Sequence, residues 1–185
     1  MKLNIPVLFG TSRENNQSHK AANFVLKQAQ EFGFDSMLYK PEDILTAPAT
    51  KRLSDYKEEN IWSKAMDKAD GLIIVSPEYN HGYPGELKMI LDQLYDQYAK
   101  KPVAIIGASG KLGGGRMVEQ LRQVVIELHM VPVSEGAYFD KIWEDLNNGK
   151  PNDDHAYESL KHVFTELKWY AEVLKEAKSK IQSTK

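Results

Sequence analysis

Short apolar runs alternate with longer segments of mixed polarity along the whole chain. The runs are rich in β-branched residues and end at Gly, Pro or polar residues, as is typical of strands buried in a parallel sheet. In the longer segments, apolar residues recur every three or four positions, which predicts helices with one buried face. The expected strands are 3–9, 34–39, 72–76, 103–108 and 131–137, and the expected helices are 21–32, 56–68, 86–99, 114–129 and 156–178.

This regular alternation predicts an α/β fold with a parallel, doubly wound sheet and right-handed crossovers. Gly33, directly after the first expected helix, suits a C′ position with a left-handed backbone. Two segments, 41–55 and 140–154, are expected to be irregular, and both are longer than most connections. Neither marks a domain boundary, so we expect a single domain over residues 1–185.

The composition excludes several classes of protein. A formal net charge of -2 over 185 residues argues against a nucleic-acid partner. The lack of cysteine excludes disulfides and thiolate chemistry, and the five histidines have no metal-ligand spacing, so we expect no metal site. The absence of a Gly-x-Ser-x-Gly elbow disfavours a hydrolase. No apolar run approaches the ~20 residues that cross a bilayer, so we expect no membrane partner and a cytoplasmic location.

The most informative segment follows the third expected strand and reads Ser76-Pro-Glu-Tyr-Asn-His-Gly-Tyr-Pro-Gly85. It is a polar and aromatic loop between an apolar strand and an amphipathic helix. In a parallel α/β sheet such a loop lies at the carboxyl edge, where ligands bind. A plain connection needs only a short hydrophilic turn, so this loop predicts a binding site for a flat ligand.

The loop after the first strand offers groups that bind phosphate. Thr11, Ser12 and Ser18 supply hydroxyls and Arg13 a guanidinium, at or before the start of a helix. The N-terminus of a helix favours an anion, so this set suits a phosphate monoester. Ser18 could instead serve only as the helix cap, or do both, but a cap leaves Arg13 without a role. The loop is neither a P-loop nor a dinucleotide fingerprint.

A third loop, 109–116, is rich in glycine and also leads into a helix. Its glycines would let the backbone approach a ligand closely, although glycine-rich turns are common after strands. In the strand order 2-1-3-4-5 the three loops converge on one crevice at the topological switch point. A phosphate seat beside amides and aromatic rings describes flavin mononucleotide (FMN) better than a sugar phosphate or a metal ion.

The segment 76–88, followed by Leu91-Asp92, resembles the signature of the NADPH-dependent FMN reductase family, which includes quinone, azo dye and chromate reductases. The resemblance covers roughly residues 3–137. It implies a flavodoxin-like three-layer sandwich with a five-stranded parallel sheet in the order 2-1-3-4-5. It also implies bound FMN, NADPH or NADH as electron donor, and assembly as a homodimer or homotetramer. The helix after Pro84 would pack either against its copy in such a dimer or on its own sheet.

The resemblance also assigns roles to individual residues. Thr11, Arg13 and Ser18 would hold the FMN phosphate, and Ser12 would contact it or face the turn. The residues expected along the ribityl chain and the isoalloxazine ring are Pro77, Glu78, Tyr79, Asn80, His81 and Gly82. Those expected near the pyrimidine end of the ring are Ser109, Gly110 and Lys111. No catalytic side chain is expected, because the flavin carries the chemistry.

The expected reaction has two steps (ping-pong): hydride passes from NAD(P)H to FMN, and then from FMN to a flavin, quinone, azo or similar small-molecule acceptor. One alternative is a non-enzymatic electron carrier like flavodoxin. Such carriers tend to be strongly acidic, which a net charge of -2 does not match. A flavin-binding sensor or interaction protein is the other alternative.

Overall fold

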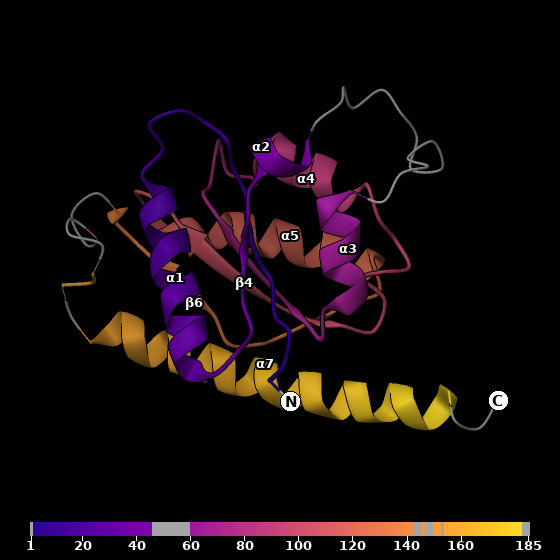
Figure 1. The fold of residues 1–185 in the computed structure, drawn as a ribbon. Helices are drawn as coiled ribbons and strands as arrows, with labels where there is room; N and C mark the ends of the chain where they lie inside the picture. The colour runs from indigo at the N-terminus through magenta and orange to yellow at the C-terminus, as the bar shows by residue number, and fades with distance from the viewer. Residues whose placement is uncertain (1, 46–59, 143–145, 147–149, 153, 183–185) are drawn as a thin grey trace.

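Six parallel strands form one sheet at the centre of the chain, and helices cover both of its faces (Figure 1). The computed structural model describes residues 2–45, 60–142, 146, 150–152 and 154–182. The strands are β1 (Val7–Phe9), β2 (Leu38–Tyr39), β3 (Leu72–Ser76), β4 (Pro102–Ala108), β5 (Val131–Pro132) and β6 (Ala137–Phe139). The helices are α1 (Ser18–Phe32), α2 (Pro41–Ile44), α3 (Ile61–Lys68), α4 (Gly85–Leu91), the 3₁₀ turn η2 (Leu112–Gly114), α5 (Gly115–Glu127) and α7 (His155–Gln182).

The strand order is β2-β1-β3-β4-β5, with β6 also paired to β4. This is the flavodoxin-like order 2-1-3-4-5, so the predicted fold is confirmed, with one additional strand. β1 and β3 pair directly, from Val7 opposite Ile73 to Phe9 opposite Val75. The connections reverse direction at this pair, and the loops after β1 and β3 therefore leave the sheet side by side.

The prediction of one fifth strand over 131–137 was wrong, because the structure divides it into β5 and β6. Pro132 has no N–H to donate, and the N–H groups of Ser134 and Glu135 donate to the carboxylate of Glu166 on α7, at 3.1 and 2.8 Å. Two extra residues therefore separate the two pairings with β4, Val103 opposite Pro132 and Ile106 opposite Ala137. The outer strand is interrupted where α7 binds its backbone.

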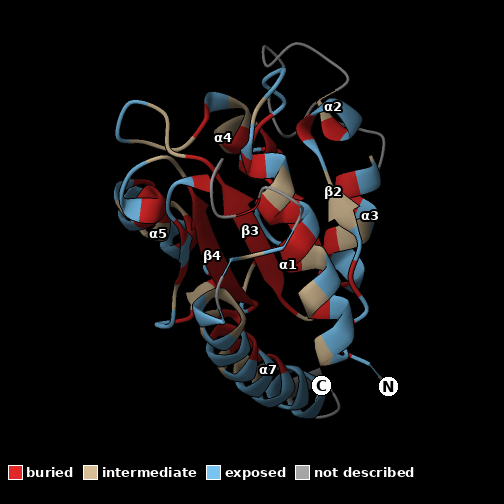
Figure 2. Cartoon of the chain, turned by 90° about the vertical axis from the view of Figure 1, so that its left-hand side faces the viewer, coloured by how far each residue is buried: buried red, intermediate tan, exposed pale blue. Residues whose placement is uncertain are grey.

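Alternate residues of each strand face different layers of helices. Val7 and Phe9 belong to the core beneath α1 and α7, whereas Leu8 and Ile74 belong to the core beneath α2, α3, α4 and α5. Figure 2 shows the strands buried between these layers, while α7 is buried along only one stripe. Burial on both faces explains why the strands read as continuous apolar runs.

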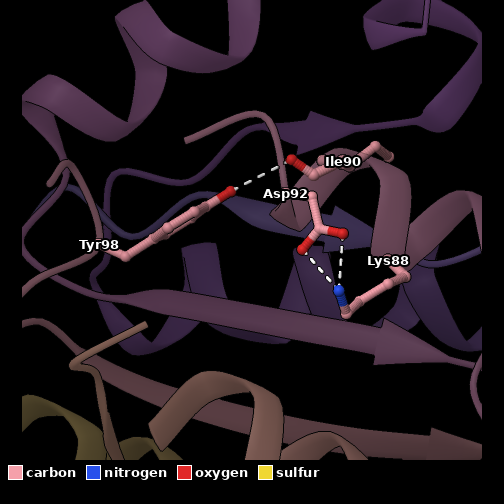
Figure 3. A network of polar contacts seen from close by, with 4 residues as sticks. All are labelled: Lys88, Ile90, Asp92 and Tyr98. Atoms are coloured by element: carbon pink, nitrogen blue, oxygen red, sulfur yellow. Dashed lines mark hydrogen bonds and ion pairs between the residues drawn. The ribbon is translucent and has the colours of Figure 1, made fainter. Parts of the chain in front are cut away.

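Several predicted helix ends were confirmed and others need correction. Gly33 has φ 109° and its N–H donates to the carbonyl of Gln30, as expected for a C′ glycine. The helix expected from 156 begins at His155. The helix expected over 86–99 ends at Leu91. Tyr98 is wholly buried and its hydroxyl donates to the carbonyl of Ile90, at 3.5 Å, which requires the chain to turn back beneath α4 (Figure 3).

The segment expected to be irregular from 41 to 55 begins with the short helix α2. Pro41 occupies its first turn, and Glu42 and Asp43 favour a helix N-terminus. Positions 46–55 lie outside the described residues, as do 56–59 of the helix expected over 56–68 and much of 140–154. The described part of that helix starts after Asn60, whose side chain accepts the N–H of Ser63. None of the described helices combines the length and the hydrophobicity needed to span a bilayer.

Candidate functional site

A cavity of about 470 Å³ lies where the loops after β1, β3 and β4 meet. This volume is typical of sites for small ligands. The three loops predicted to converge therefore do so in the structure. The lining residues are Arg13, Glu14, Asn15, Asn16, Gln17, Ser18, Pro77, Glu78, Tyr79, Ala108, Ser109, Gly110 and Ile142.

The expected site residues fall into two groups. Those in the cavity wall are Arg13, Ser18, Pro77, Glu78, Tyr79, Ser109 and Gly110. Those outside this lining are Thr11, Ser12, Asn80, His81, Gly82 and Lys111. The contacts of each residue explain the division.

Thr11 and Ser12 face helix α4 rather than the cavity. The hydroxyl of Thr11 donates to Oε1 of Glu86 at 2.8 Å, and the N–H of Ser12 donates to the same oxygen at 2.7 Å. The Ser12 hydroxyl adds a third bond to it at 3.3 Å. Burial raises the pKa of Glu86, but these hydrogen bonds together bring the pKa below its ordinary value. Sequence reasoning missed Glu86, and the only available signal was an acidic residue in the first turn of the expected helix.

The N-cap residue of α1 is Gln17, without a side-chain cap, and the side chain that accepts from the first turn is Asn16 rather than Ser18. Oδ1 of Asn16 accepts the N–H of His19 at 2.9 Å and the Ser18 hydroxyl at 3.2 Å. The alternative that Ser18 serves only as the cap was therefore wrong. Ser18 instead places a hydroxyl in the cavity wall beside the first turn of α1.

Arg13 supplies positive charge at this end of the cavity. Its guanidinium carbon lies 5.2 Å from the centroid of the Tyr79 ring, which is a cation–π distance. Within the part of the chain that the structure describes, Arg13 forms no ion pair with a carboxylate. Its charge is thus available to an anionic ligand.

The loop after β3 reverses in a tight turn. Tyr79 and Gly82 exchange backbone hydrogen bonds of 2.9 and 3.0 Å. The two residues between them, Asn80 and His81, have φ values of 50° and 67°, as in a type I′ turn. Both are exposed at the tip of the loop. Neither residue is among those that line the cavity.

Glu78 connects the loop after β3 to helix α5. Its Oε2 accepts the N–H groups of Arg116 and Met117 at 3.2 and 3.3 Å, and its Oε1 lies 3.3 Å from the Arg116 guanidinium. Only 7% of the Glu78 side chain is exposed. A carboxylate at this place satisfies N–H groups that lack partners within the helix and interacts favourably with its dipole. Glu78 therefore holds two walls of the cavity together.

Two glycines of the third loop, Gly113 and Gly114, are packed closely, whereas Gly110 lines the cavity. A Cβ on Gly107 would lie 2.0 Å from the carbonyl oxygen of Gly113, and one on Gly113 would lie 2.5 Å from Cβ of Tyr138. Gly113 and Gly114 also have positive φ values, 56° and 86°. The loop is folded onto β4 and β6, and Lys111 is exposed outside the lining.

Helix α4 contacts other segments at its start and near its end. Glu86 accepts from the first loop, and the carbonyl of Ile90 accepts from Tyr98, while Lys88 and Asp92 form an ion pair of 2.6 Å within the end of the helix (Figure 3). The Tyr98 hydroxyl, which donates to Ile90, also accepts the indole N–H of Trp62 at 2.7 Å. The position of Glu86 relative to the cavity is consequently fixed by the core.

The residues present fit FMN. Arg13, the Ser18 hydroxyl and the N-terminal turn of α1 line the cavity and form the donor set that a phosphate requires. Pro77, the Tyr79 ring, Ser109 and Gly110 also line it, and the Arg13 guanidinium lies against the Tyr79 ring. A cationic donor set beside a flat, partly aromatic wall suits the phosphate and the ring system of a flavin nucleotide.

Comparison with known proteins agrees with this assignment. The family model described as NADPH-dependent FMN reductase matches residues 3–144. An NAD(P)H-dependent FMN reductase of Saccharomyces cerevisiae is 33% identical over 95 residues, 50% of this chain and 49% of that protein. A quinone reductase of Escherichia coli is 31% identical over 121 residues, 63% of this chain and 64% of that protein. The match thus spans about half to two thirds of these relatives.

A solved structure supports the fold alone. The flavoenzyme FerB of Paracoccus denitrificans, an NAD(P)H:acceptor oxidoreductase, superimposes with a TM-score of 0.72. The superposition covers 93% of this chain and 98% of that chain, at 19% sequence identity.

Proposed function

Because the chain belongs to the NADPH-dependent FMN reductase family, we propose that it is an oxidoreductase that transfers hydride from NADPH or NADH, through bound FMN, to a small-molecule acceptor. The observation that carries the proposal is the cavity itself, which brings Arg13 and the start of α1 together with Pro77 and Tyr79. The proposed acceptors are flavins, quinones, azo compounds or similar planar molecules.

Each part of the cavity has a separate task in this proposal. Arg13 and Ser18 bind the FMN phosphate, while Thr11 and Ser12 hold the first loop in place through Glu86. Pro77 and the Tyr79 ring form the wall beside the isoalloxazine. Glu78 lines the cavity and fixes that wall to α5.

The remaining expected residues shape the entrance and the far end of the ring. Ser109 and Gly110 lie where the pyrimidine end would be bound, and Asn80, His81 and Gly82 form the rim. Lys111 is exposed outside the cavity lining. The open rim accommodates acceptors of different shapes, which is consistent with a broad range of flat substrates.

When bound, FMN would supply the redox chemistry, which is the transfer of hydride between the nicotinamide and the acceptor. The two substrates would use the same face in turn, so the reaction follows a ping-pong scheme. The side chains bind, orient and exclude water, and none is required as a general acid or base. Assembly as a homodimer or homotetramer is part of the proposal and would enclose the rim further.

The test is direct. Purified protein is expected to be yellow, or to gain FMN on addition, and to oxidise NADPH or NADH when given a quinone. Double-reciprocal plots of initial rate against nucleotide concentration, at several fixed quinone concentrations, are expected to give parallel lines. Colourless protein that gains no FMN would contradict the proposal, and bound FMN without oxidation of either nucleotide would favour an electron carrier or a sensor.

A further inference from the structure

We propose that Glu86 is a specificity-determining residue of the flavin site, whose negative charge beside the first loop weakens binding of the flavin phosphate. The inference rests on the proposed function, since it concerns how that site distinguishes FMN from riboflavin, which has no phosphate. It predicts that the ratio of FMN affinity to riboflavin affinity is smaller than Arg13 and the start of α1 would give without the charge of Glu86.

Glu86 binds the donors of Thr11 and Ser12 that the resemblance assigned to the phosphate. Its Oε1 accepts the Thr11 hydroxyl, the Ser12 N–H and the Ser12 hydroxyl, at 2.8, 2.7 and 3.3 Å. A bound phosphate can share a hydroxyl or an N–H only by competing with this carboxylate. The phosphate therefore depends on Arg13, Ser18 and the backbone of the α1 start.

The Glu86 carboxylate also lies close to the cavity wall. The Thr11 hydroxyl that donates to Glu86 also accepts the N–H of Arg13 at 3.2 Å and lies 3.3 Å from the Tyr79 hydroxyl. Arg13 and Tyr79 both line the cavity. One intervening residue thus separates the Glu86 carboxylate from two residues of the cavity wall. A phosphate bound by Arg13 and Ser18 would lie in the same region as the Glu86 carboxylate, and like charges at short range repel each other in a partly hydrated site.

Glu86 keeps its charge at neutral pH. Burial opposes ionisation, but the hydrogen bonds from Ser12 and Thr11 lower its pKa overall. The carboxylate also stands in the first turn of α4, where the helix dipole favours a negative charge. A phosphate entering the site therefore meets a fixed anion.

A purely structural role for Glu86 makes a different prediction. If the carboxylate only holds the first loop in place, its loss would weaken FMN and riboflavin to the same degree. Glu86→Gln separates the two roles, because the amide oxygen still accepts from Thr11 and Ser12 while the charge is removed. The ratio of the two flavin affinities is then the informative quantity.

The experiment measures dissociation constants for FMN and riboflavin by quenching of flavin fluorescence, using flavin-free protein at low ionic strength. Glu86→Gln is expected to tighten FMN binding about three- to tenfold and to change riboflavin binding less than about twofold. Arg13→Met should act in the opposite direction, weakening FMN selectively. Glu172→Gln, an equal change of charge on the remote surface of α7, should alter neither constant.

Two further results decide the matter. Glu86→Ala removes both the charge and the hydrogen bonds. We expect it to raise the preference for FMN over riboflavin even if the affinities for both flavins fall, and a preference that does not rise would contradict the inference. An unchanged or lowered preference in Glu86→Gln would overturn the inference while leaving the proposed function intact. Failure of the unsubstituted protein to bind either flavin would overturn both.

Discussion

The two edges of the sheet both hold charged side chains against the backbone, but in different ways. At the carboxyl edge, Glu78 and Glu86 each accept several hydrogen bonds from neighbouring loops and helices. At the amino edge, the ammonium of Lys101 donates to the carbonyl of Met66 in the last turn of α3. Lys101 is only 7% exposed, and its surroundings are those of a core.

The number of hydrogen-bond partners of Glu86 and Lys101 decides whether the fold stabilises the charged form of each side chain. Burial raises the pKa of Glu86, but its several donors outweigh burial and lower it. Burial and the charge of Lys178 lower the pKa of Lys101 to about 8, against the opposing effect of Asp67 and Asp70. The surroundings of Glu86 therefore favour its charged form, whereas those of Lys101 weaken its charged form, although a pKa of about 8 leaves it mostly protonated at pH 7.

The largest expected effect is the loss of stability on substituting a glycine, which should differ between the two edges. A Cβ on Gly107, at the carboxyl end of β4, would meet a backbone oxygen at 2.0 Å, so Gly107→Ala should destabilise by more than about 3 kcal/mol. At the amino edge, a Cβ on Gly71 would meet Ile5 and Pro102 at 3.1 Å, and Gly71→Ala should cost about 1 kcal/mol. Denaturant unfolding measures both.

Gly115→Ala is the control for this pair, because nothing lies within 4 Å of a Cβ at that helical position. It should leave stability unchanged or raise it by about 0.5 kcal/mol. Equal costs for Gly107→Ala and Gly71→Ala would show that the third loop is not packed on β4 as the structure has it.

The second prediction tests Glu78. Glu78→Ala leaves the N–H groups of Arg116 and Met117 without their acceptor, so we expect a loss of about 2 kcal/mol of unfolding free energy. FMN binding should weaken as well, because the loops after β3 and β4 lose their connection. The matched control is Glu119→Ala on the exposed face of α5, which should cost less than about 0.5 kcal/mol. Loss of binding without loss of stability would assign Glu78 a direct contact with the flavin instead.

The third prediction concerns Lys101 and alkaline pH. Its pKa is about 8 in the folded chain and 10.5 when unperturbed, so between these values the unfolded state holds the extra proton. Stability should therefore rise with pH in this window, by at most about 1.4 kcal/mol per pH unit from this group. Lys101→Met should remove that rise and be as stable as the unsubstituted protein, or about 1 kcal/mol more stable, at pH 7. Parallel pH profiles for the two proteins would contradict the assignment.

The smallest expected effect lies at acid pH and concerns Glu86. Its folded pKa is lowered, so its stabilising contribution is present above its ordinary pKa of 4.5 and is lost as pH falls through the folded value. The difference in unfolding free energy between the unsubstituted protein and Glu86→Gln should be under about 1 kcal/mol near pH 7 and should shrink below pH 4.5. A difference that grows on acidification would mean that burial, not hydrogen bonding, dominates at Glu86.

The periodicity of apolar residues was enough to predict most of the fold. Runs such as 72–76 are buried on both faces and therefore carry an unmistakable pattern, and Gly33 marks a helix end through its own backbone preference. The division of the fifth strand could not be predicted in this way. It depends on Glu166, which lies far along the chain and binds the backbone of Ser134 and Glu135.

The site followed the same rule. The convergence of the three loops could be predicted because strand order fixes it, and Arg13 and Tyr79 do line one cavity. The division of labour among polar residues could not, because Thr11, Ser12 and Glu78 have chemically suitable groups that the fold uses internally. Which donor faces a ligand and which faces a neighbouring helix is decided by tertiary contacts.

The central claim is that the carboxyl edge holds an FMN that NAD(P)H reduces in a step independent of the acceptor. Anaerobic mixing of FMN-loaded protein with NADPH or NADH alone, followed by stopped-flow absorbance of the flavin, tests this directly. The account predicts that the flavin absorbance is lost on mixing with nucleotide and restored when a quinone is then added. The account would be contradicted if the flavin absorbance persisted with either nucleotide alone at any concentration. It would also be contradicted if the absorbance fell only when nucleotide and quinone were both present.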